Sequence, residues 1–250
     1  GAAQLVLSGT IQSGGVVWAL SVLCVLSPSS HHVDLRCTAT PRSAAALRAF
    51  YAPTFHAGDG SFGAAKATAL FPGLEYLTGD EVSSGDYGIV PPHSDRQVPH
   101  PYKVTMPLMA VAGGGVCAAV FWDPSQRWDG VHACPSACFA SPERWEDRAS
   151  HLLGVFAPSV PEGLPENARE LPEPMAVAAG KPLSLSISVA ALAPADDVTD
   201  AVRYWFDVNG VPDPPTPPRM WEAESALVAK GLIETGWDAE KKGWHNALAD

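Results

Sequence analysis

Hydrophobic and polar residues alternate along several short runs of this chain, a pattern typical of strands with one buried face. The clearest run is 183–189, where Leu, Leu, Ile and Val alternate with three serines. Residues 4–40 contain runs rich in Val, Leu, Ile and Thr that are separated by Ser-Gly-Gly and Pro-Ser-Ser, which predicts three strands joined by turns. Residues 43–51 fit a short helix and a strand equally well.

The middle of the chain predicts further strands and one long connection. Residues 102–124 have the pattern of a hairpin with its turn at Gly113–Gly115. Two apolar runs downstream, 136–142 and 151–160, predict two more strands. Residues 53–101 are irregular and rich in Gly, Pro, Ser and His, which favours a functional loop unless the segment contains strands of its own.

The pattern changes near the C-terminus. Residues 195–210 predict a helix, capped by Asp196 or Asp197 and ended by a glycine. Residues 211–219, VPDPPTPPR, predict an extended proline-rich strap. Residues 220–250 place tryptophan, leucine and valine at helical spacing, which predicts one or two helices.

Together these elements predict a mainly β fold, a sandwich of two antiparallel sheets with a short C-terminal α-helical tail. We expect residues 1–195 to form the β domain, 196–218 the helix and strap, and 219–250 the helical tail. A tail of this size is too small for a domain of its own. It either lies across a sheet or begins a helical domain that continues after residue 250.

Composition narrows the class of partner. The 250 residues include 16 Lys and Arg against 27 Asp and Glu, a net charge of −11 with no basic stripe, which excludes nucleic acid. The 22 glycines and 24 prolines have no collagen-like period and agree with many strands joined by turns. No apolar run reaches the roughly 20 residues of a membrane-spanning helix, so no membrane partner is expected. Neutral ligands such as sugars are compatible with this excess of acidic over basic residues. The sequence encodes no cell location, and an extracellular or periplasmic one is the expectation.

The five cysteines do not form a disulfide scaffold, because an odd number leaves at least one thiol free. The spacing of His132, Cys134 and Cys138 is similar to half of a zinc-binding motif. The second pair of ligands that a structural zinc site needs is missing from the sequence nearby. We therefore expect small buried thiols, and neither a metal nor a cofactor.

Four segments of the chain resemble a known family: GDGSFGAAKATALFPGLEYLTGDEVSSG, PHPYKVTMPLMAVAGGGVCAAVFWDPSQRWDG, HLLGVFAPSVPEGLPENAR and PPTPPRMWEAE. They look like segments of bacterial proteins that carry a galactose-mutarotase-like β-supersandwich. The resemblance covers most of residues 1–218. It implies a carbohydrate context in which an (α/α) toroid of glycoside-hydrolase type follows the sandwich. In related enzymes the sandwich lends loops to the active site of the toroid, and the helical domain typically supplies the general acid and base. The resemblance assigns no catalytic residue to this chain.

Glu75, Asp80 and Glu81 are the first candidates for sugar chemistry. Glycoside hydrolysis uses two carboxyl groups, about 5–5.5 Å apart for retention of configuration and about 6.5–9.5 Å apart for inversion. Three acidic residues in one glycine-rich segment could supply such a pair or contact a ligand. The alternative is a structural bend, in which the carboxylates accept backbone hydrogen bonds or pair with Lys66 or Arg96.

The segment FWDPSQRWDG supplies the second set of candidates. Trp122 and Trp128 have the character of sugar platforms, and Asp123 and Arg127 could bond the hydroxyl groups at the edge of a sugar ring. The alternative places Trp122 in the core at the end of a strand, with the following residues as a turn.

The histidines and short motifs give little further evidence for a catalytic or metal site. His56, His93 and His100 flank the acidic segment, but no H-x-H or H-E-x-x-H spacing supports a metal site. In a mutarotase-type reaction His100 could act as general acid and Glu75 as general base, although their spacing does not require it. The GDGSFG motif lacks the spacing of a nucleophile elbow, and no phosphate-binding glycine loop is present.

Three hypotheses follow. The first is a carbohydrate-associated domain of a glycoside-hydrolase-like protein that shapes a saccharide cleft with these ligand-binding residues: Glu75, Asp80, Glu81, Trp122, Asp123, Arg127 and Trp128. The second is a self-contained sugar-acting enzyme, a glycosidase or aldose epimerase, that uses Glu75, Glu81 and His100. The third is a purely structural module.

Overall fold

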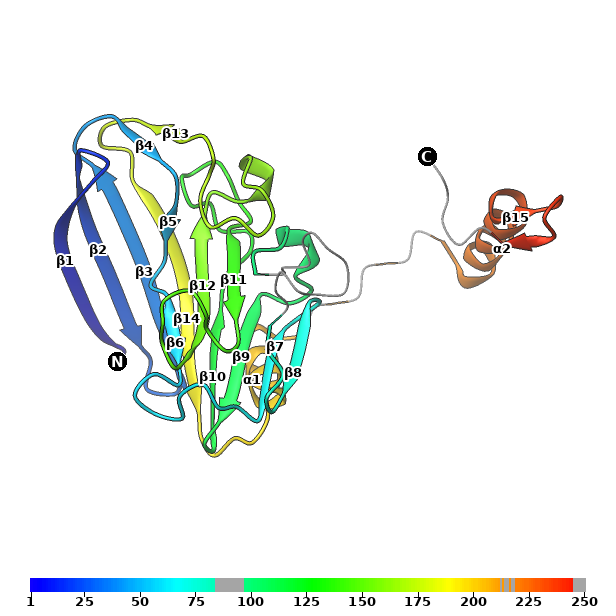
Figure 1. Cartoon of the computed structure of the whole chain (residues 1–250), viewed down its shortest axis with the longest axis horizontal. Helices are drawn as coiled ribbons and strands as arrows, with labels where there is room; N and C mark the ends of the chain where they lie inside the picture. The colour runs from blue at the N-terminus through cyan, green and yellow to red at the C-terminus, as the bar shows by residue number, and fades with distance from the viewer. Residues whose placement is uncertain (84–96, 212, 214–215, 217–218, 245–250) are drawn as a thin grey trace. The chain divides into compact units, whose positions relative to one another are not determined.

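The computed structural model describes residues 1–83, 97–211, 213, 216 and 219–244 (Figure 1). The chain divides into two compact units, Gly1–Gly210 and Val211–Asp250, and each is described by itself. The first unit is a β-sandwich with one helix, so the mainly β fold predicted from the sequence is confirmed. No helix in the described part of the chain is both long enough and apolar enough to span a bilayer.

The larger sheet has eight strands, and every neighbouring pair is antiparallel. Its edge at β1 is clearly visible in Figure 1. In sheet order the strands are β1 (Ala3–Ser13), β2 (Val16–Leu26), β3 (His32–Pro41), β14 (Leu183–Leu192), β10 (Val116–Phe121), β9 (Leu108–Gly113), β7 (Thr68–Phe71) and β8 (Glu75–Thr78).

The smaller sheet has four strands: β11 (Ser136–Ala140), β12 (His151–Ala157), β5 (Phe50–Tyr51) and β6 (Phe55–Ala57). A separate two-stranded sheet joins β13 (Met175–Val177) to β4 (Ala45–Leu47). The segment 43–51, which fitted a helix and a strand equally well, therefore contains β4 and β5. Two short 3-10 helices, η1 (Pro101–Lys103) and η2 (Val160–Glu162), lie in the connections.

The main core lies between the two large sheets. Leu183, Leu185 and Ile187 point into it from β14, while the serines between them face the other side of the sheet. Phe71 of the larger sheet meets Phe139 of the smaller one with ring centroids 5.4 Å apart. The alternation seen in the sequence thus decides which side chains enter the core.

A second core lies on the outer face of the larger sheet, where α1 (Thr199–Asn209) covers β9 and β10. These two strands are buried on both faces, which explains why their sequence is continuously apolar rather than alternating. The N-cap position is Val198, with no side-chain cap bond, rather than Asp196 or Asp197 as predicted. The Asp197 carboxylate still accepts a hydrogen bond from the amide of Thr199, the first helical residue, at 2.7 Å. The helix ends before Gly210, which adopts a positive φ of 76°.

The long segment 53–101 is not one irregular loop, because its described part contains β6, β7 and β8. The hairpin that follows turns at Gly114 and Gly115, both with positive φ, one residue later than the glycine run predicts. Gly113 instead belongs to β9, where a β-carbon would lie 2.8 Å from the Phe62 ring. That glycine is needed for close packing rather than for the turn.

The second unit contains α2 (Trp221–Gly231), a short π-helical segment η3 (Leu232–Gly236) and a small hairpin of β15 (Trp237–Asp238) and β16 (Gly243–Trp244). The rings of Trp237 and Trp244 meet edge to face, with centroids 5.0 Å apart. Within residues 219–244 one α-helix is present where the sequence predicted one or two for the tail. A helical domain after this unit stays a prediction.

Candidate functional site

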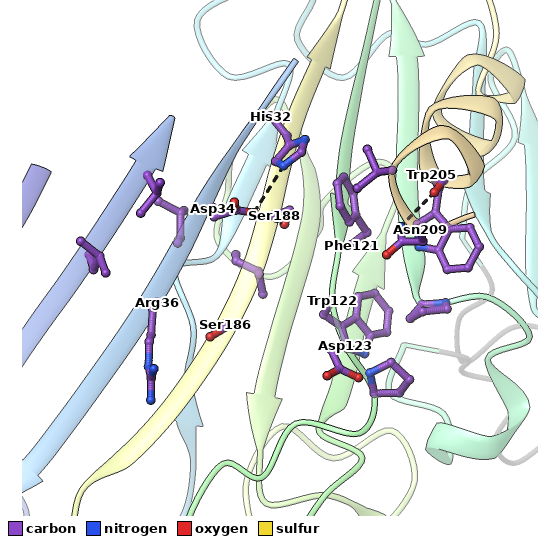
Figure 2. Close-up of a pocket in the computed structure, with 17 residues that line it drawn as sticks. His32, Asp34, Arg36, Phe121, Trp122, Asp123, Ser186, Ser188, Trp205 and Asn209 are labelled. Carbon is purple, nitrogen blue, oxygen red and sulfur yellow. Dashed lines mark hydrogen bonds and ion pairs between the residues drawn. The ribbon is translucent and has the colours of Figure 1, made fainter. Parts of the chain in front are cut away.

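An open cleft of about 480 Å³ lies on the outer face of the larger sheet, beside the C-terminal end of α1 (Figure 2). Strand β3 contributes His32, Asp34 and Arg36 to its lining, all on one face because alternate residues of a strand point the same way. Strand β14 places Ser186 opposite Arg36 and Ser188 opposite Asp34. Two neighbouring strands thus present a continuous polar surface.

Asp34 is the central carboxylate of this surface. Its Oδ1 accepts a hydrogen bond from the Ser188 hydroxyl at 2.5 Å, and the His32 Nε2 lies 3.5 Å from the same oxygen. The side chain remains 53% exposed, so a ligand in the cleft can reach it. Two residues on neighbouring strands therefore orient a carboxylate that is open to the cleft.

His32 is held from its other side by α1. Its Nδ1 lies 2.7 Å from the Tyr204 hydroxyl, and that hydroxyl accepts a hydrogen bond from the His31 amide at 2.8 Å. A neutral imidazole has one donor and one acceptor nitrogen. When the Tyr204 hydroxyl donates to Nδ1, the ring proton lies on Nε2, the nitrogen near the Asp34 carboxylate. The Phe121 ring packs edge-on against this histidine at 5.4 Å.

Aromatic and amide groups form the opposite side of the cleft. Trp205 and Asn209 lie four residues apart on α1 and therefore on one face of the helix. The Asn209 side chain donates to the Trp205 carbonyl at 2.9 Å, which holds the amide at the helix end. Trp122 also lines the cleft but is only 7% exposed, so most of its ring belongs to the core.

Asp123 adds a second carboxylate to the lining. The chain turns directly after β10, and the Asp123 Oδ1 accepts bonds from the Ser125 amide at 2.8 Å and the Ser125 hydroxyl at 2.7 Å. These bonds fix the carboxylate orientation while the residue stays exposed. The cleft thus combines indole surface with two oriented carboxylates, a guanidinium and an amide.

No family model matches the sequence, and no curated protein sequence matches it. Among solved structures, the chain is similar to a proposed aldose 1-epimerase from Klebsiella pneumoniae subsp. pneumoniae MGH 78578, at 9% identity and a TM-score of 0.44, covering 88% of this chain and 58% of that one. A proposed aldose 1-epimerase from Escherichia coli K12 gives 13% identity and a TM-score of 0.38, with 76% and 65% covered. A galactose mutarotase related enzyme from Lactobacillus acidophilus gives 6% identity and a TM-score of 0.39, with 77% and 69% covered.

The chain is similar in fold to galactose-mutarotase-related structures. It spans between 58% and 69% of the lengths of these three proteins. The chemistry of the cleft has to be argued from its own side chains.

The acidic segment lies outside the described lining of the cleft. The Glu81 Oε2 accepts bonds from the Thr78 amide at 2.7 Å and the Thr78 hydroxyl at 3.0 Å. These bonds hold the pKa of the Glu81 carboxyl below its ordinary value. The Lys66 ammonium donates to the Glu81 carbonyl. This residue closes a turn, as the alternative interpretation of the segment predicted.

The other candidates near this segment are also separate from the cleft lining. Glu75 is buried on β8 opposite Phe71, and Asp80 is exposed in the turn after that strand. The His100 ring accepts a bond from the Tyr102 amide at 3.2 Å, and its own amide donates to Glu166 at 2.7 Å. Catalysis by Glu75, Glu81 or His100 stays a prediction. His93 and Arg96 fall outside the described residues.

The segment FWDPSQRWDG is divided between the cleft and the core. Trp122 and Asp123 line the cleft, whereas Trp128 is 1% exposed and stacks on His132 at 5.7 Å. A ligand could reach the Trp128 ring only if this turn opened. Arg127 is exposed and donates to the Val131 carbonyl at 2.7 Å, which stabilises the turn.

The Asp129 carboxylate is hydrogen-bonded to several groups of this turn and to Lys181. Burial would raise the pKa of its carboxyl, but hydrogen bonds from the His132 and Val131 amides, the His132 ring and the Lys181 ammonium outweigh this and lower the pKa to about 2. The ionised carboxylate is therefore a strong structural group. It holds the segment on either side of Trp128.

Among the described residues, no group of three or more His, Cys, Asp or Glu side chains is arranged to hold a metal ion. All five cysteines are free thiols. Burial raises the pKa of Cys117 to about 12 and contributes most to raising those of Cys37 and Cys138 to about 11, so these three thiols are protonated at neutral pH.

Sequence reasoning missed most of the cleft, namely His32, Asp34, Arg36, Ser186, Ser188, Trp205 and Asn209. One signal was present: the run HVDLRCTA alternates, so its polar residues had to share a solvent-facing surface. The alternation does not predict that Trp205 lies at the cleft. This residue is about 170 positions further along the chain, and the packing of α1 on the sheet brings it to the cleft.

Proposed function

We propose that the chain is a saccharide-binding β-sandwich module and that the outer-face cleft is its binding site. The observation that carries the proposal is the convergence of Trp122 and Trp205 with Asp34, Arg36 and Asp123 around one open cavity. An indole offers an apolar surface for the C–H face of a pyranose. Carboxylates accept bonds from sugar hydroxyls, and a guanidinium donates to them.

The size and charge of the cleft favour a small neutral ligand. A cavity of about 480 Å³ falls within the common range of roughly 300–1,000 Å³ for small-molecule sites and suits a monosaccharide or disaccharide. Two carboxylates face one guanidinium within a chain of net charge −11, which disfavours phosphorylated or otherwise anionic ligands. The glycoside-hydrolase context of the module rests on the sequence resemblance.

A sugar-acting enzyme is the second candidate, and the pair of His32 and Asp34 favours it. The Asp34 carboxylate is open to the cleft and has the His32 Nε2 3.5 Å from one of its oxygens, so it can accept a proton from a bound hydroxyl group. This candidate predicts faster interconversion of the α and β anomers of an aldose, followed by polarimetry. If the chain binds the sugar but leaves that rate unchanged, the site only binds.

The binding proposal is tested with a panel of neutral mono- and oligosaccharides on a glycan array, followed by isothermal titration calorimetry of any hit. Trp205→Ala and Asp34→Asn are expected to weaken binding at least about tenfold, because each removes a principal contact. Matched controls are Trp221→Ala, on the exposed surface of the second unit, and Asp207→Asn, exposed on α1. Both controls are expected to bind as the parent does.

Two results would contradict the proposal. One is the absence of binding to every neutral saccharide at millimolar concentration. The other is binding that survives Trp205→Ala and Asp34→Asn but is lost in Asp80→Asn, which would move the site to the acidic segment. The circular dichroism spectrum of each variant separates lost binding from lost folding.

A further inference from the structure

Strand β1 is an exposed edge of the larger sheet, and all eleven of its residues are exposed. It pairs with β2 in one uninterrupted register, from Ala3 opposite Leu26 to Ser13 opposite Val16. In Figure 1 it forms the outermost strand on the side of the N-terminus. One side of this strand is thus bonded to β2 and the other is an open edge.

This edge lacks the usual features that prevent strands from associating. It contains no charged residue, no proline and no bulge in its pairing with β2. Leu5, Leu7 and Ile11 are 57%, 54% and 50% exposed on the same face of the sheet. An edge of this kind is a template for an added strand.

The turn after β1 shows which backbone groups are available. Because the two-residue turn Gly14–Gly15 makes Ser13 and Val16 a hydrogen-bonded pair, the odd-numbered residues of β1 bond to β2. The even-numbered residues direct their amide and carbonyl groups to the open edge. Ser8 is the middle one of these, with two on either side: Gln4, Val6, Thr10 and Gln12.

The sequence of β1 is complementary to itself about Ser8. In an antiparallel pair of two copies centred there, Leu5 lies opposite Ile11, and Gln4 lies opposite Gln12. Gly9 lies opposite Leu7 and leaves space for the two Leu7 side chains to meet diagonally. This register pairs the whole strand, with Val6 opposite Thr10 and Ala3 opposite Ser13 in the remaining positions.

Charge distribution also favours a second copy. The chain carries a net charge of −11, yet apart from the histidines its first charged side chain is Asp34, so the hairpin of β1 and β2 is uncharged. Two copies can approach through this hairpin with little repulsion, whereas most other surfaces carry acidic residues.

We propose that β1 pairs with β1 of a second copy of this chain, antiparallel about a two-fold axis at Ser8. The pairing forms about ten backbone hydrogen bonds, two for each pair of outward-facing residues. A single pair of strands buries less than the roughly 800 Å² per partner of a standard interface. The dimer is therefore expected to form at micromolar rather than nanomolar concentration.

The decisive experiment is disulfide trapping at the axis. In Ser8→Cys the two introduced residues lie opposite each other with Cα atoms about 5.5 Å apart, within disulfide reach. The matched control is Thr10→Cys, because Thr10 lies opposite Val6 and the two Thr10 positions are about 14 Å apart. Mild oxidation is expected to give a covalent dimer for Ser8→Cys but not for Thr10→Cys or for the parent with its own five thiols.

A second measurement tests the register without cysteine. Sedimentation velocity of the parent between about 5 and 200 μM is expected to show a shift from the 26.2 kDa monomer to twice that mass. Leu5→Lys is expected to abolish the shift, and Leu5→Lys with Ile11→Glu to restore it by placing opposite charges across the interface. A monomer at every concentration, or equal trapping at positions 8 and 10, would overturn the proposal.

Discussion

Two regions of the sandwich contain the same types of side chain but differ in how far those side chains are exposed to solvent. The outer-face cleft combines Trp205, His32, Asp34 and Arg36, and the turn after β10 combines Trp128, His132, Asp129 and Lys181. In the turn, the tryptophan is 1% exposed and the Asp129 side chain 7% exposed. In the cleft, the Asp34 side chain is 53% exposed.

The difference lies in how completely each carboxylate is satisfied. Asp129 accepts two backbone amides, an imidazole and an ammonium, so its bonding is directed inward and stabilises the fold. Asp34 is oriented by one hydroxyl beside a histidine and remains open to solvent. The presence of tryptophan, histidine and aspartate therefore does not identify a ligand site. A structural cluster is distinguished from a binding surface by whether its polar groups already have their full set of hydrogen-bond partners within the protein.

The largest expected effect is a difference in stability between alanine variants of the buried and the cleft tryptophan. Trp128→Ala is expected to lower the free energy of unfolding by about 3–5 kcal/mol, because it empties a fully buried site. Trp205→Ala is expected to lower it by roughly 1 kcal/mol, since that ring is only partly buried. Urea unfolding followed by tryptophan fluorescence and circular dichroism measures both. Equal losses would remove the distinction between the two regions.

Asp129→Asn is expected to lower the free energy of unfolding by about 2 kcal/mol at pH 7, because the folded pKa of about 2 lies well below the unfolded value of 3.8. A carboxylate with a lowered pKa stabilises the fold above its unfolded pKa, and the contribution is lost as the pH falls toward 2. The gap between parent and variant should therefore shrink from pH 5 to pH 2. Asp207→Asn serves as the exposed control, and a gap that is independent of pH would contradict the assignment.

Arg36→Ala tests the polar side of the cleft and is expected to weaken saccharide binding roughly ten- to a hundredfold, the loss of one hydrogen bond from a charged donor. The free energy of unfolding should change little, because the Arg36 side chain contributes one neutral-acceptor hydrogen bond, from its Nε to the Ser184 hydroxyl at 3.0 Å. Calorimetric titration with the best neutral saccharide provides the measurement. Undiminished affinity together with lost stability would assign Arg36 to the fold instead.

Tyr204→Phe has the smallest expected effect, about 1 kcal/mol in stability. It removes the hydroxyl contacts with the His31 amide and the His32 ring, but the exposed His31 amide can bond water instead. Its more specific consequence concerns the tautomer. Without the hydroxyl donor, the proton of the neutral His32 ring is no longer confined to Nε2, which nitrogen-15 NMR of the imidazole can detect. An unchanged tautomer would show that Asp34 alone sets the protonated nitrogen.

The strands were predictable because the patterns that mark them involve residues close together in the sequence. Alternation in 183–189 and in HVDLRCTA correctly assigned side chains to opposite faces, and the glycine pair in the hairpin marked its turn. The acidic segment was harder to interpret, since its carboxylates resemble a catalytic group in sequence. The hydrogen bonds from Thr78 to Glu81 depend on the local turn geometry, which the residue types do not specify.

The sequence by itself determined that this protein is a β-sandwich, which residues share each face of a strand, and that the surface is acidic. Only the tertiary structure decided that α1 brings Trp205 over the face that carries Asp34, and that Trp128 turns inward while Trp122 reaches the cleft. The physical reason is the range of the interactions. Alternation and turn chemistry act between neighbours in the chain, whereas a site is formed by elements that meet only when the sheet and helix pack together.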